Sequence, residues 1–214
     1  MALPSDRAPL AERVEELLAV GGPLPIVSAG DPVLRRGIEP FDGQLEPALL
    51  ARFIEALRVT MHAAPGVGVA APQVGVELRI AVIEDPAPVP DEVRVVRGRV
   101  PQPFQVLVNP SYEPVGTVRA AFFEGCLSVP GWQAVVARPL EVRLSGEDEY
   151  GRPVDEVFNG WPARIVQHET DHLDGMLYLD RAELRSLSSN EAMAQRWTQA
   201  TPQEAAKAFG FELP

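Results

Sequence analysis

The chain has 214 residues, 46% of them hydrophobic and 23% charged, so it can bury a sizeable core and wholesale disorder is excluded. Its 30 acidic against 19 basic residues give a net charge of -11, which disfavours general binding to nucleic acid or to anionic membranes. The sequence contains no apolar run of about 18 residues, so we expect no membrane-spanning helix.

The N-terminal sequence and the cysteine content indicate a cytoplasmic protein. Residues 1–20 carry several acidic side chains and lack the basic start and apolar stretch of a signal peptide. The single cysteine, Cys126, cannot form an internal disulfide, as expected in a reducing compartment.

Apolar side chains at helical spacing predict two helices in the N-terminal part. The first lies within residues 5–20 and ends at Gly21-Gly22. The second is a core-facing helix over residues 44–64, with Asp42 as its N-cap.

Short apolar runs predict strands in the middle of the chain, at residues 78–83, 104–108, 134–136, 140–144 and 154–158. The segment 84–103 between the first two is rich in Pro, Val and Arg and is predicted to be a surface insertion or a mobile arm.

The C-terminal part is predicted to contain two further helices. Asn159 is expected to cap one that starts near Trp161 and stops at Gly175, and Thr201 to open a capping box before a short Ala-rich helix. Several short strands around one central helix predict an α+β fold rather than a parallel βαβ fold.

The strongest chemical signal is His168-Glu169-Thr170-Asp171-His172 on the predicted central helix. Side chains four residues apart share a helix face, so His168 and His172 can bind one metal ion, and Glu169 can take a proton from its bound water. The alternative is a surface helix with two unrelated histidines. Because the chain has only 3 histidines, we prefer the metal site.

A catalytic metal usually has three protein ligands, so one more is needed. No histidine follows His172. Glu191, about twenty residues downstream, has the spacing used in one class of proteases. The other candidate is Cys126, although a lone cytosolic cysteine is more often a buried inert thiol. The residues alone leave this choice open.

The segment Gly66-Val67-Gly68-Val69-Ala70-Ala71-Pro72-Gln73 imitates a dinucleotide-binding turn. It follows a predicted helix instead of a strand, however, and Pro72 would interrupt any helix that it opened. Its small residues would instead let an extended peptide approach the backbone closely, and Gln73 adds an amide donor.

Three segments in this order resemble the motifs of the peptide deformylase family, namely Gly66 to Gln73, Glu124-Gly125-Cys126-Leu127-Ser128, and His168 to His172. The resemblance spans about residues 30–180 and favours Cys126 over Glu191 as the third ligand. We therefore expect a single catalytic domain over residues 23–214, preceded by an N-terminal helical extension over residues 1–22 that lies outside the resemblance. The domain's fold would be short antiparallel strands packed around the metal-binding helix.

The resemblance also implies an activity, which is removal of the formyl group from the N-formylmethionyl end of nascent peptides, with release of formate. Cys126, His168 and His172 would bind one divalent metal, with Fe2+ expected and Zn2+, Ni2+ or Co2+ able to substitute. Glu169 would be the general base, and the backbone N–H of Leu127 and the amide of Gln73 would stabilise the oxyanion.

For the substrate, the resemblance implies backbone hydrogen bonds from Val67, Gly68 and Gly125 to a peptide that lies as an added strand. Ile165 and Trp132 would line an apolar pocket for methionine, although ordinary core is nearly as good an interpretation of both.

The partners implied by the resemblance are N-formylmethionyl peptides, with the ribosome near the nascent chain left open and no nucleic-acid or membrane partner. Many bacterial members of the family carry an arginine shortly after the second motif. In this chain no arginine lies between the second motif and Arg138.

Two other functions remain as alternatives. A zinc endopeptidase with His168, His172 and Glu191 as ligands would keep its metal in Cys126→Ser and lose it in Glu191→Ala, and a deformylase would do the reverse. An inactive homologue would bind formylated peptides or the ribosome without turnover. The intact Glu169, together with Gln73 and Cys126, argues against it.

Overall fold

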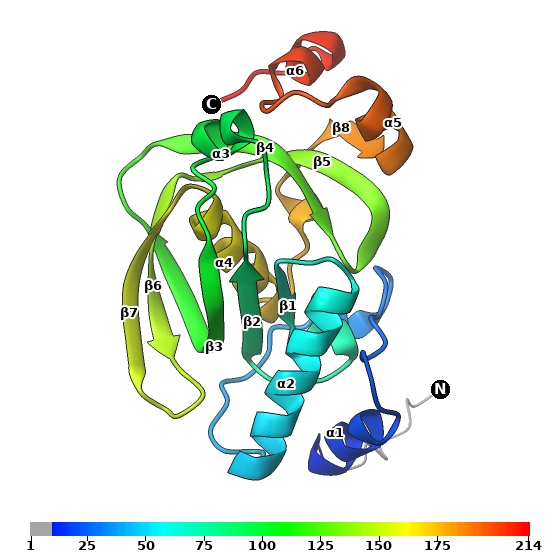
Figure 1. Cartoon of the computed structure of the whole chain (residues 1–214), viewed down its shortest axis with the longest axis vertical. Coiled ribbons are helices and arrows are strands. Elements are labelled where there is room, and N and C mark those ends of the chain that lie inside the picture. Colours follow the sequence, from blue (N-terminus) through cyan, green and yellow to red (C-terminus); the bar gives the residue numbers. More distant parts are fainter. Residues whose placement is uncertain (1–9) are drawn as a thin grey trace.

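Two antiparallel sheets surround a buried helix in the computed structural model, which describes residues 10–214 (Figure 1). The α-helices are α1 (Leu10–Ala19), α2 (Pro47–Ala63), α3 (Asp91–Arg97), α4 (Gly160–Leu173), α5 (Asn190–Arg196) and α6 (Gln203–Phe209). Short 3-10 helices cover Pro32–Arg35, Ala71–Val74 and Tyr178–Asp180. Figure 1 shows α4 at the centre, with α1 and α2 at one end and α5 and α6 at the other.

The strands are β1 (Gly68–Ala70), β2 (Ile80–Asp85), β3 (Gln102–Pro114), β4 (Arg119–Cys126), β5 (Val129–Pro139), β6 (Glu141–Glu147), β7 (Pro153–Asn159) and β8 (Ala182–Ser189). They form a five-stranded sheet in the order β1-β2-β3-β6-β7 and a three-stranded sheet in the order β4-β5-β8. Every neighbouring pair is antiparallel. The predicted α+β class, with antiparallel strands around a central helix, is therefore confirmed.

Helix α4 is buried on nearly all sides and contacts strands of both sheets. Its buried residues include apolar side chains such as Ile165 and Val166, but also charged and polar ones. Polar groups that are removed from water need hydrogen-bond partners within the protein. This requirement explains why ion pairs and polar contacts gather around α4.

The two N-terminal helices pack together, as their apolar spacing predicts. Val14 of α1 is fully buried, and α1 contacts α2, whose buried residues recur at helical spacing. The part of the first predicted helix before Leu10 lies outside the described residues. Helix α2 starts at Pro47 with Glu46 at the N-cap position, so the prediction of Asp42 as N-cap is wrong. Proline is favoured in a first helical turn and sets this start.

A strand is present at each of the five predicted positions, although β2 and β6 start one or two residues later than predicted and all five end later. Sequence reasoning missed β1, β4, β8, α3 and α5. In β8 the buried side chains are those of Ser186 and Ser188, whereas Leu184 and Leu187 are exposed. This strand therefore lacks the buried apolar alternation by which a strand is identified from sequence.

The segment 84–103 lies on the surface, as predicted, and its helix α3 buries none of its residues. It is nevertheless anchored at both ends rather than extending as an arm. Arg99 forms an ion pair with the buried carboxylate of Asp85, with Nε 2.8 Å from Oδ2. At the start of α4, a Cβ on Gly160 would lie only 2.6 Å from the carbonyl oxygen of Gly98. The end of α3 is thus held closely against α4.

Two predicted side-chain caps do not form, although both helices are present. Asn159 occupies the N-cap position of α4, as predicted, but its side chain donates a hydrogen bond to Glu141 instead of capping the helix. Gly175 follows the end of α4 with a positive φ, as the predicted stop signal requires. Pro202 occupies the N-cap position of α6, so the capping box predicted at Thr201 does not form.

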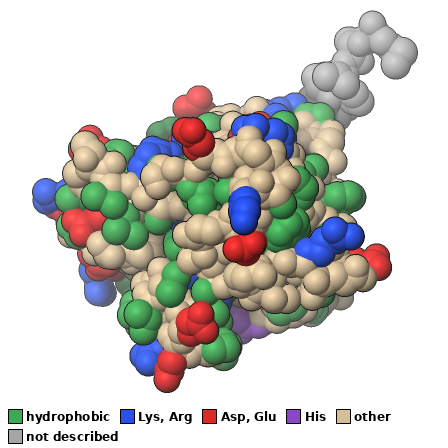
Figure 2. All heavy atoms as spheres, turned by 90° about the horizontal axis from the view of Figure 1, so that it is seen from above, with side chains coloured by type: hydrophobic (Ala, Val, Ile, Leu, Met, Phe, Trp, Pro, Cys, Tyr) green, Lys and Arg blue, Asp and Glu red, His purple; other side chains and the backbone are tan. Residues whose placement is uncertain are grey.

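No helix among residues 10–214 is long and apolar enough to cross a bilayer. Figure 2 views the molecule from the end that carries α3, α5 and α6, where acidic and basic side chains are interspersed among hydrophobic ones. This face therefore presents no field of a single sign.

Candidate active site

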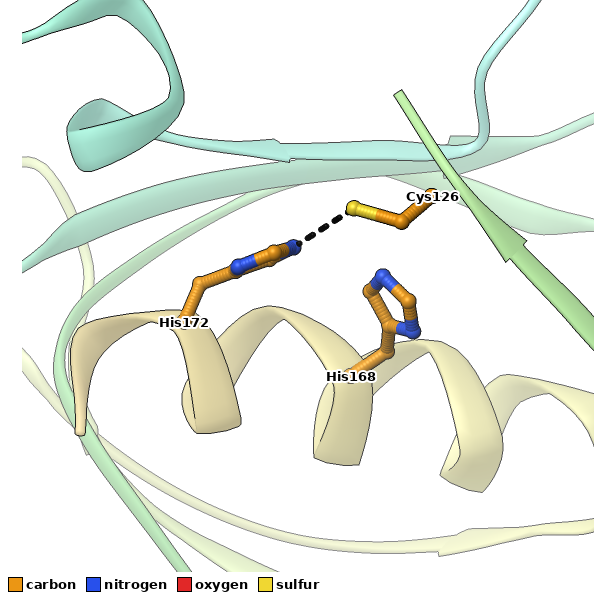
Figure 3. Close-up of side chains that lie close together, drawn as sticks. All are labelled: Cys126, His168 and His172. Atoms are coloured by element: carbon orange, nitrogen blue, oxygen red, sulfur yellow. Dashed lines mark hydrogen bonds between the residues drawn. The ribbon is translucent and has the colours of Figure 1, made fainter. Parts of the chain in front are cut away.

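Helix α4 directs two histidine side chains toward a cysteine at the end of strand β4 (Figure 3). His168 and His172 are one helical turn apart, and their ring centroids are separated by 5.0 Å. The Sγ of Cys126 lies 3.2 Å from Nε2 of His172. One donor atom from each of the three residues lies within 4.8 Å of the others, which is the spacing of metal ligands.

A register shift at the end of β4 brings Cys126 to this position. Strands β4 and β5 pair regularly as far as Gly125 and Gln133, and then Cys126 pairs with Val129. An irregularity of this kind bends a strand and redirects the side chain next to it. The tight connection between β4 and β5 therefore turns the thiol toward α4.

The donor set fits a divalent transition metal. The Nδ1 of His168 lies 3.2 Å from Oε2 of Glu124, which leaves its Nε2 for a metal. Figure 3 shows a ring nitrogen of each histidine turned toward Cys126. One thiolate and two imidazoles, with a fourth position open, form a typical catalytic zinc site and also suit Fe(II).

The two histidines differ in their surroundings. Burial by itself lowers the pKa of His168, but the adjacent Cys126 and Glu124 outweigh burial and raise that pKa well above its usual value. In His172, burial and then repulsion by His168 hold the pKa well below its usual value. The Nδ1 of His172 is buried without a hydrogen-bond partner among residues 10–214. The neutral imidazole is the form that binds a metal, and His172 is held in that form. His168 would lose a proton when a metal binds, as histidine ligands generally do.

Glu169 follows His168 and lines the same cavity. Its side chain is buried, and its Oε2 has no hydrogen-bond partner within the described part of the chain. Burial raises the pKa of Glu169 to about 7, against the opposing effects of His168 and Arg138. Gly68 makes room for this carboxylate, because a Cβ at that position would clash with it. A carboxyl group with such a pKa can accept a proton and return it.

Gln73 and Leu127 lie beside the cluster. Gln73 is buried, and its Oε1 accepts a hydrogen bond from the backbone N–H of Ala70 at 2.9 Å. Its Nε2 donates to Ser128 Oγ at 3.3 Å and to Cys126 Sγ at 3.5 Å. Leu127 directly follows Cys126 and lines the cavity. An amide donor and a backbone N–H are thus placed next to the predicted ligands.

A buried ion network next to the cluster was missed by sequence reasoning. Glu124 accepts hydrogen bonds from Nε and Nη2 of Arg138 at 2.7 and 3.0 Å, and from Arg164. Arg138 also pairs with Asp171 at 2.8 Å. Burial by itself would raise the pKa of Glu124, but Arg138, His168 and Arg164 outweigh it and hold that pKa well below its usual value. Arg138 is therefore committed to the interior and is not available to a peptide.

Glu124→Gln is expected to destabilise the fold by about 3–5 kcal/mol, because it leaves the buried guanidinium groups of Arg138 and Arg164 without this counter-charge. Denaturant unfolding of the variant and the unchanged enzyme, both at the same metal content, measures the effect. Glu191→Gln removes a carboxylate from the exposed face of α5 and serves as the control, with a change of about 0.5 kcal/mol or less. Equal effects of the two substitutions would contradict this account.

A cavity of about 690 Å³ adjoins the cluster. It is lined by ten of the eleven residues that the sequence analysis assigned to the site, namely Val67, Gly68, Gln73, Gly125, Cys126, Leu127, Trp132, Ile165, His168 and Glu169. His172 is the exception and is almost fully buried. Glu191 is exposed on α5, where it accepts a hydrogen bond from Gln195, and does not belong to the cluster.

The sequence comparisons give matches to peptide deformylases. A family model described as polypeptide deformylase matches residues 23–188. Peptide deformylase 1 of Streptomyces coelicolor is 81% identical, with 100% of this chain and 98% of that protein aligned. The peptide deformylase of Bifidobacterium adolescentis is 48% identical, with 95% of each chain aligned.

Solved structures give the same result. A class I type b peptide deformylase from Acinetobacter baumannii with bound Met-Ala-Ser is 34% identical, with a TM-score of 0.64 over 74% of this chain and 98% of that chain. A peptide deformylase from Synechococcus elongatus in complex with actinonin is also 34% identical, with a TM-score of 0.64 over 90% of each chain. Sequence and fold therefore agree with the resemblance carried by the three motifs: the chain belongs to the peptide deformylase family and is an enzyme.

Proposed function

We propose that this enzyme hydrolyses the formyl group of N-formylmethionyl peptides at a divalent metal held by Cys126, His168 and His172. Removal of the N-formyl group from nascent polypeptides is the activity of its family. The observation that carries the metal-dependent mechanism is the position of Glu169. Its buried carboxylate, with one oxygen unpartnered among residues 10–214, lines the same cavity as Cys126 and His168.

Each residue of the site has a separate role in the proposed reaction. When bound, the metal supplies Lewis acidity, which lowers the pKa of water and polarises the formyl carbonyl. Glu169 accepts the proton of the attacking water and later returns it to the departing amine. The Nε2 of Gln73 and the backbone N–H of Leu127 donate to the oxyanion that develops on the formyl group. Glu124 acts as a positioning residue, because it holds the Nδ1 side of His168.

The peptide would lie between two free sheet edges. Strand β1 is the edge of the five-stranded sheet and β4 is the edge of the three-stranded sheet, and Gly68 and Gly125 of these strands line the cavity. The carbonyl of Val67 accepts a hydrogen bond from Glu84 on the β2 side. Because backbone groups alternate in direction along a strand, those of Gly68 point to the free edge. Gly68 is thus better placed than the Val67 carbonyl to pair with a peptide strand.

We assign the methionine pocket to the part of the cavity near Ile165 and Trp132. Ile165 lies about one turn before His168 on α4 and is 4% exposed, so it contributes to the core as well as to the cavity wall. Trp132 is 47% exposed at the cavity, which argues against the interpretation of this side chain as ordinary core.

The proposal includes Fe2+ as the native metal, with Zn2+, Ni2+ or Co2+ able to take its place, because one sulfur and two imidazole donors suit all four. We place the enzyme in the cytoplasm, in keeping with a single free cysteine. A net charge of -11 opposes direct binding to RNA, so contact with a ribosome would involve ribosomal proteins.

Formate release from formyl-Met-Ala-Ser tests the proposed function. The enzyme is purified anaerobically, its metal content is measured, and the peptide products are identified by mass spectrometry. We expect formate and Met-Ala-Ser in equal amounts, with no cleavage between residues. Absence of formate from metal-loaded enzyme would overturn the proposal, and internal peptide cleavage would favour the endopeptidase alternative.

A further inference from the structure

Three arginine side chains gather at one end of the cavity, around the ring of Trp161 at the start of α4. Arg97 and Arg99 come from the segment 84–103, and Arg164 comes from α4. Their guanidinium carbons lie 5.2, 5.3 and 5.8 Å from the centroid of the Trp161 ring, respectively. All four side chains line the cavity. In a chain with a net charge of -11, this is a local concentration of positive charge.

Two of the three arginines form ion pairs with carboxylates. Arg99 binds Asp85 through two hydrogen bonds, of 2.8 and 3.0 Å, and Arg164 binds Glu124. Arg97 has no carboxylate within ion-pair distance among residues 10–214, and its Nε donates to the backbone carbonyl of Ala200 at 3.0 Å.

Arg97 therefore has no carboxylate as a counter-charge. Burial, followed by repulsion from Arg99 and Arg164, lowers the pKa of Arg97. The indole N–H of Trp161 is buried nearby and has no acceptor in the described part of the chain. A negatively charged group at this end of the cavity would meet an unpaired guanidinium and could accept from an unused donor.

The distance between the arginines around Trp161 and the metal cluster matches the length of a short extended peptide. Trp161 precedes His168 by two turns of α4, which corresponds to about 10 Å along the helix axis. An extended peptide advances about 3.3 Å per residue, so a side-chain carboxylate on its second or third residue reaches about this far. Arg97 is also fixed relative to α4, because Gly98 packs directly on Gly160.

We propose that Arg97 binds a side-chain carboxylate of the substrate, so that the enzyme prefers N-formylmethionyl peptides with Asp or Glu as their second or third residue. This inference rests on the proposed function and specifies the substrates of the same site. Arg97 then determines specificity and is not a catalytic residue, since it lies away from the reacting atoms.

The test compares kcat/KM for formylated tripeptide amides, so that no terminal carboxylate competes. The neutral reference is formyl-Met-Ala-Ser amide, and Asp or Lys replaces Ala in one pair of peptides and Ser in another. We expect about tenfold higher kcat/KM for the better of the two Asp peptides than for the reference, and no gain for the Lys peptides. Equal values for Asp, Lys and neutral peptides would overturn the inference and leave the proposed function intact. Formate from none of them would overturn the proposed function itself.

Variants on α3 assign the preference to Arg97. In Arg97→Gln, which keeps an amide donor for Ala200, the ratio of Asp to neutral peptide should fall to about one. Arg97→Lys should keep most of the ratio. Arg94→Gln removes the same charge one turn away, from an exposed side chain paired with Asp91, and should leave the ratio unchanged. Thermal melting confirms that each variant is folded. A preference for Asp peptides that survives in Arg97→Gln, or that is lost in Arg94→Gln, would contradict the assignment.

Discussion

Cys126→Ser should weaken metal binding by at least about 100-fold, and with it abolish formate release. The thiolate would be the negatively charged ligand of the set, and a serine hydroxyl at neutral pH does not supply that charge. Cys126 Sγ lies 3.2 Å from His172 Nε2, so the substitution removes a donor from within the cluster. Metal content after gel filtration and competition with a chelator measure the loss, independently of activity.

Glu191→Ala is the matched variant, because the endopeptidase alternative makes Glu191 the third ligand. Glu191 is exposed on α5 and accepts a hydrogen bond from Gln195 at 3.1 Å, apart from the Cys126 cluster. We expect this variant to retain the metal content and the formate release of the unchanged enzyme. The opposite pattern, with metal lost from Glu191→Ala and retained by Cys126→Ser, would exclude the proposed ligand set.

The side chains nearest the chemistry could be predicted from sequence because each motif is short and local. His168 and His172 meet on one face of α4 through helical periodicity alone. The choice between Cys126 and Glu191 could not be made by the same means, because a register shift at the end of β4 directs the thiol to α4. The resemblance to a known family, and not the spacing of the residues, favoured Cys126 as the third ligand.

The charged residues that surround these side chains could not be predicted, because the residues that contact one another are distant in sequence. Glu124 meets Arg138 across the β4–β5 pair and Arg164 on α4, contacts that no local periodicity encodes. Arg97 is a similar case. Its segment lacks a buried apolar pattern, and it reaches the cavity only because Gly98 packs on Gly160 at the start of α4.

Glu169→Gln should lower kcat for deformylation by about 10²- to 10⁴-fold while the metal remains bound. The substitution preserves the size of the side chain beside Gly68, where a Cβ has no room, but removes the group that accepts the proton. Because Glu169 Oε2 has no hydrogen-bond partner among residues 10–214, no ion pair is broken by the change. We therefore expect unchanged metal content and little change in the free energy of unfolding.

The comparison with Cys126→Ser separates loss of the base from loss of the metal. Glu169→Gln should still bind the product Met-Ala-Ser with nearly unchanged affinity, whereas Cys126→Ser should fail at the earlier step of metal binding. Formate release at close to the unchanged rate from metal-loaded Glu169→Gln would show that another group carries the proton. Gln73 cannot take this role, because its amide has no basic site near neutral pH and its Oε1 is already occupied by the N–H of Ala70.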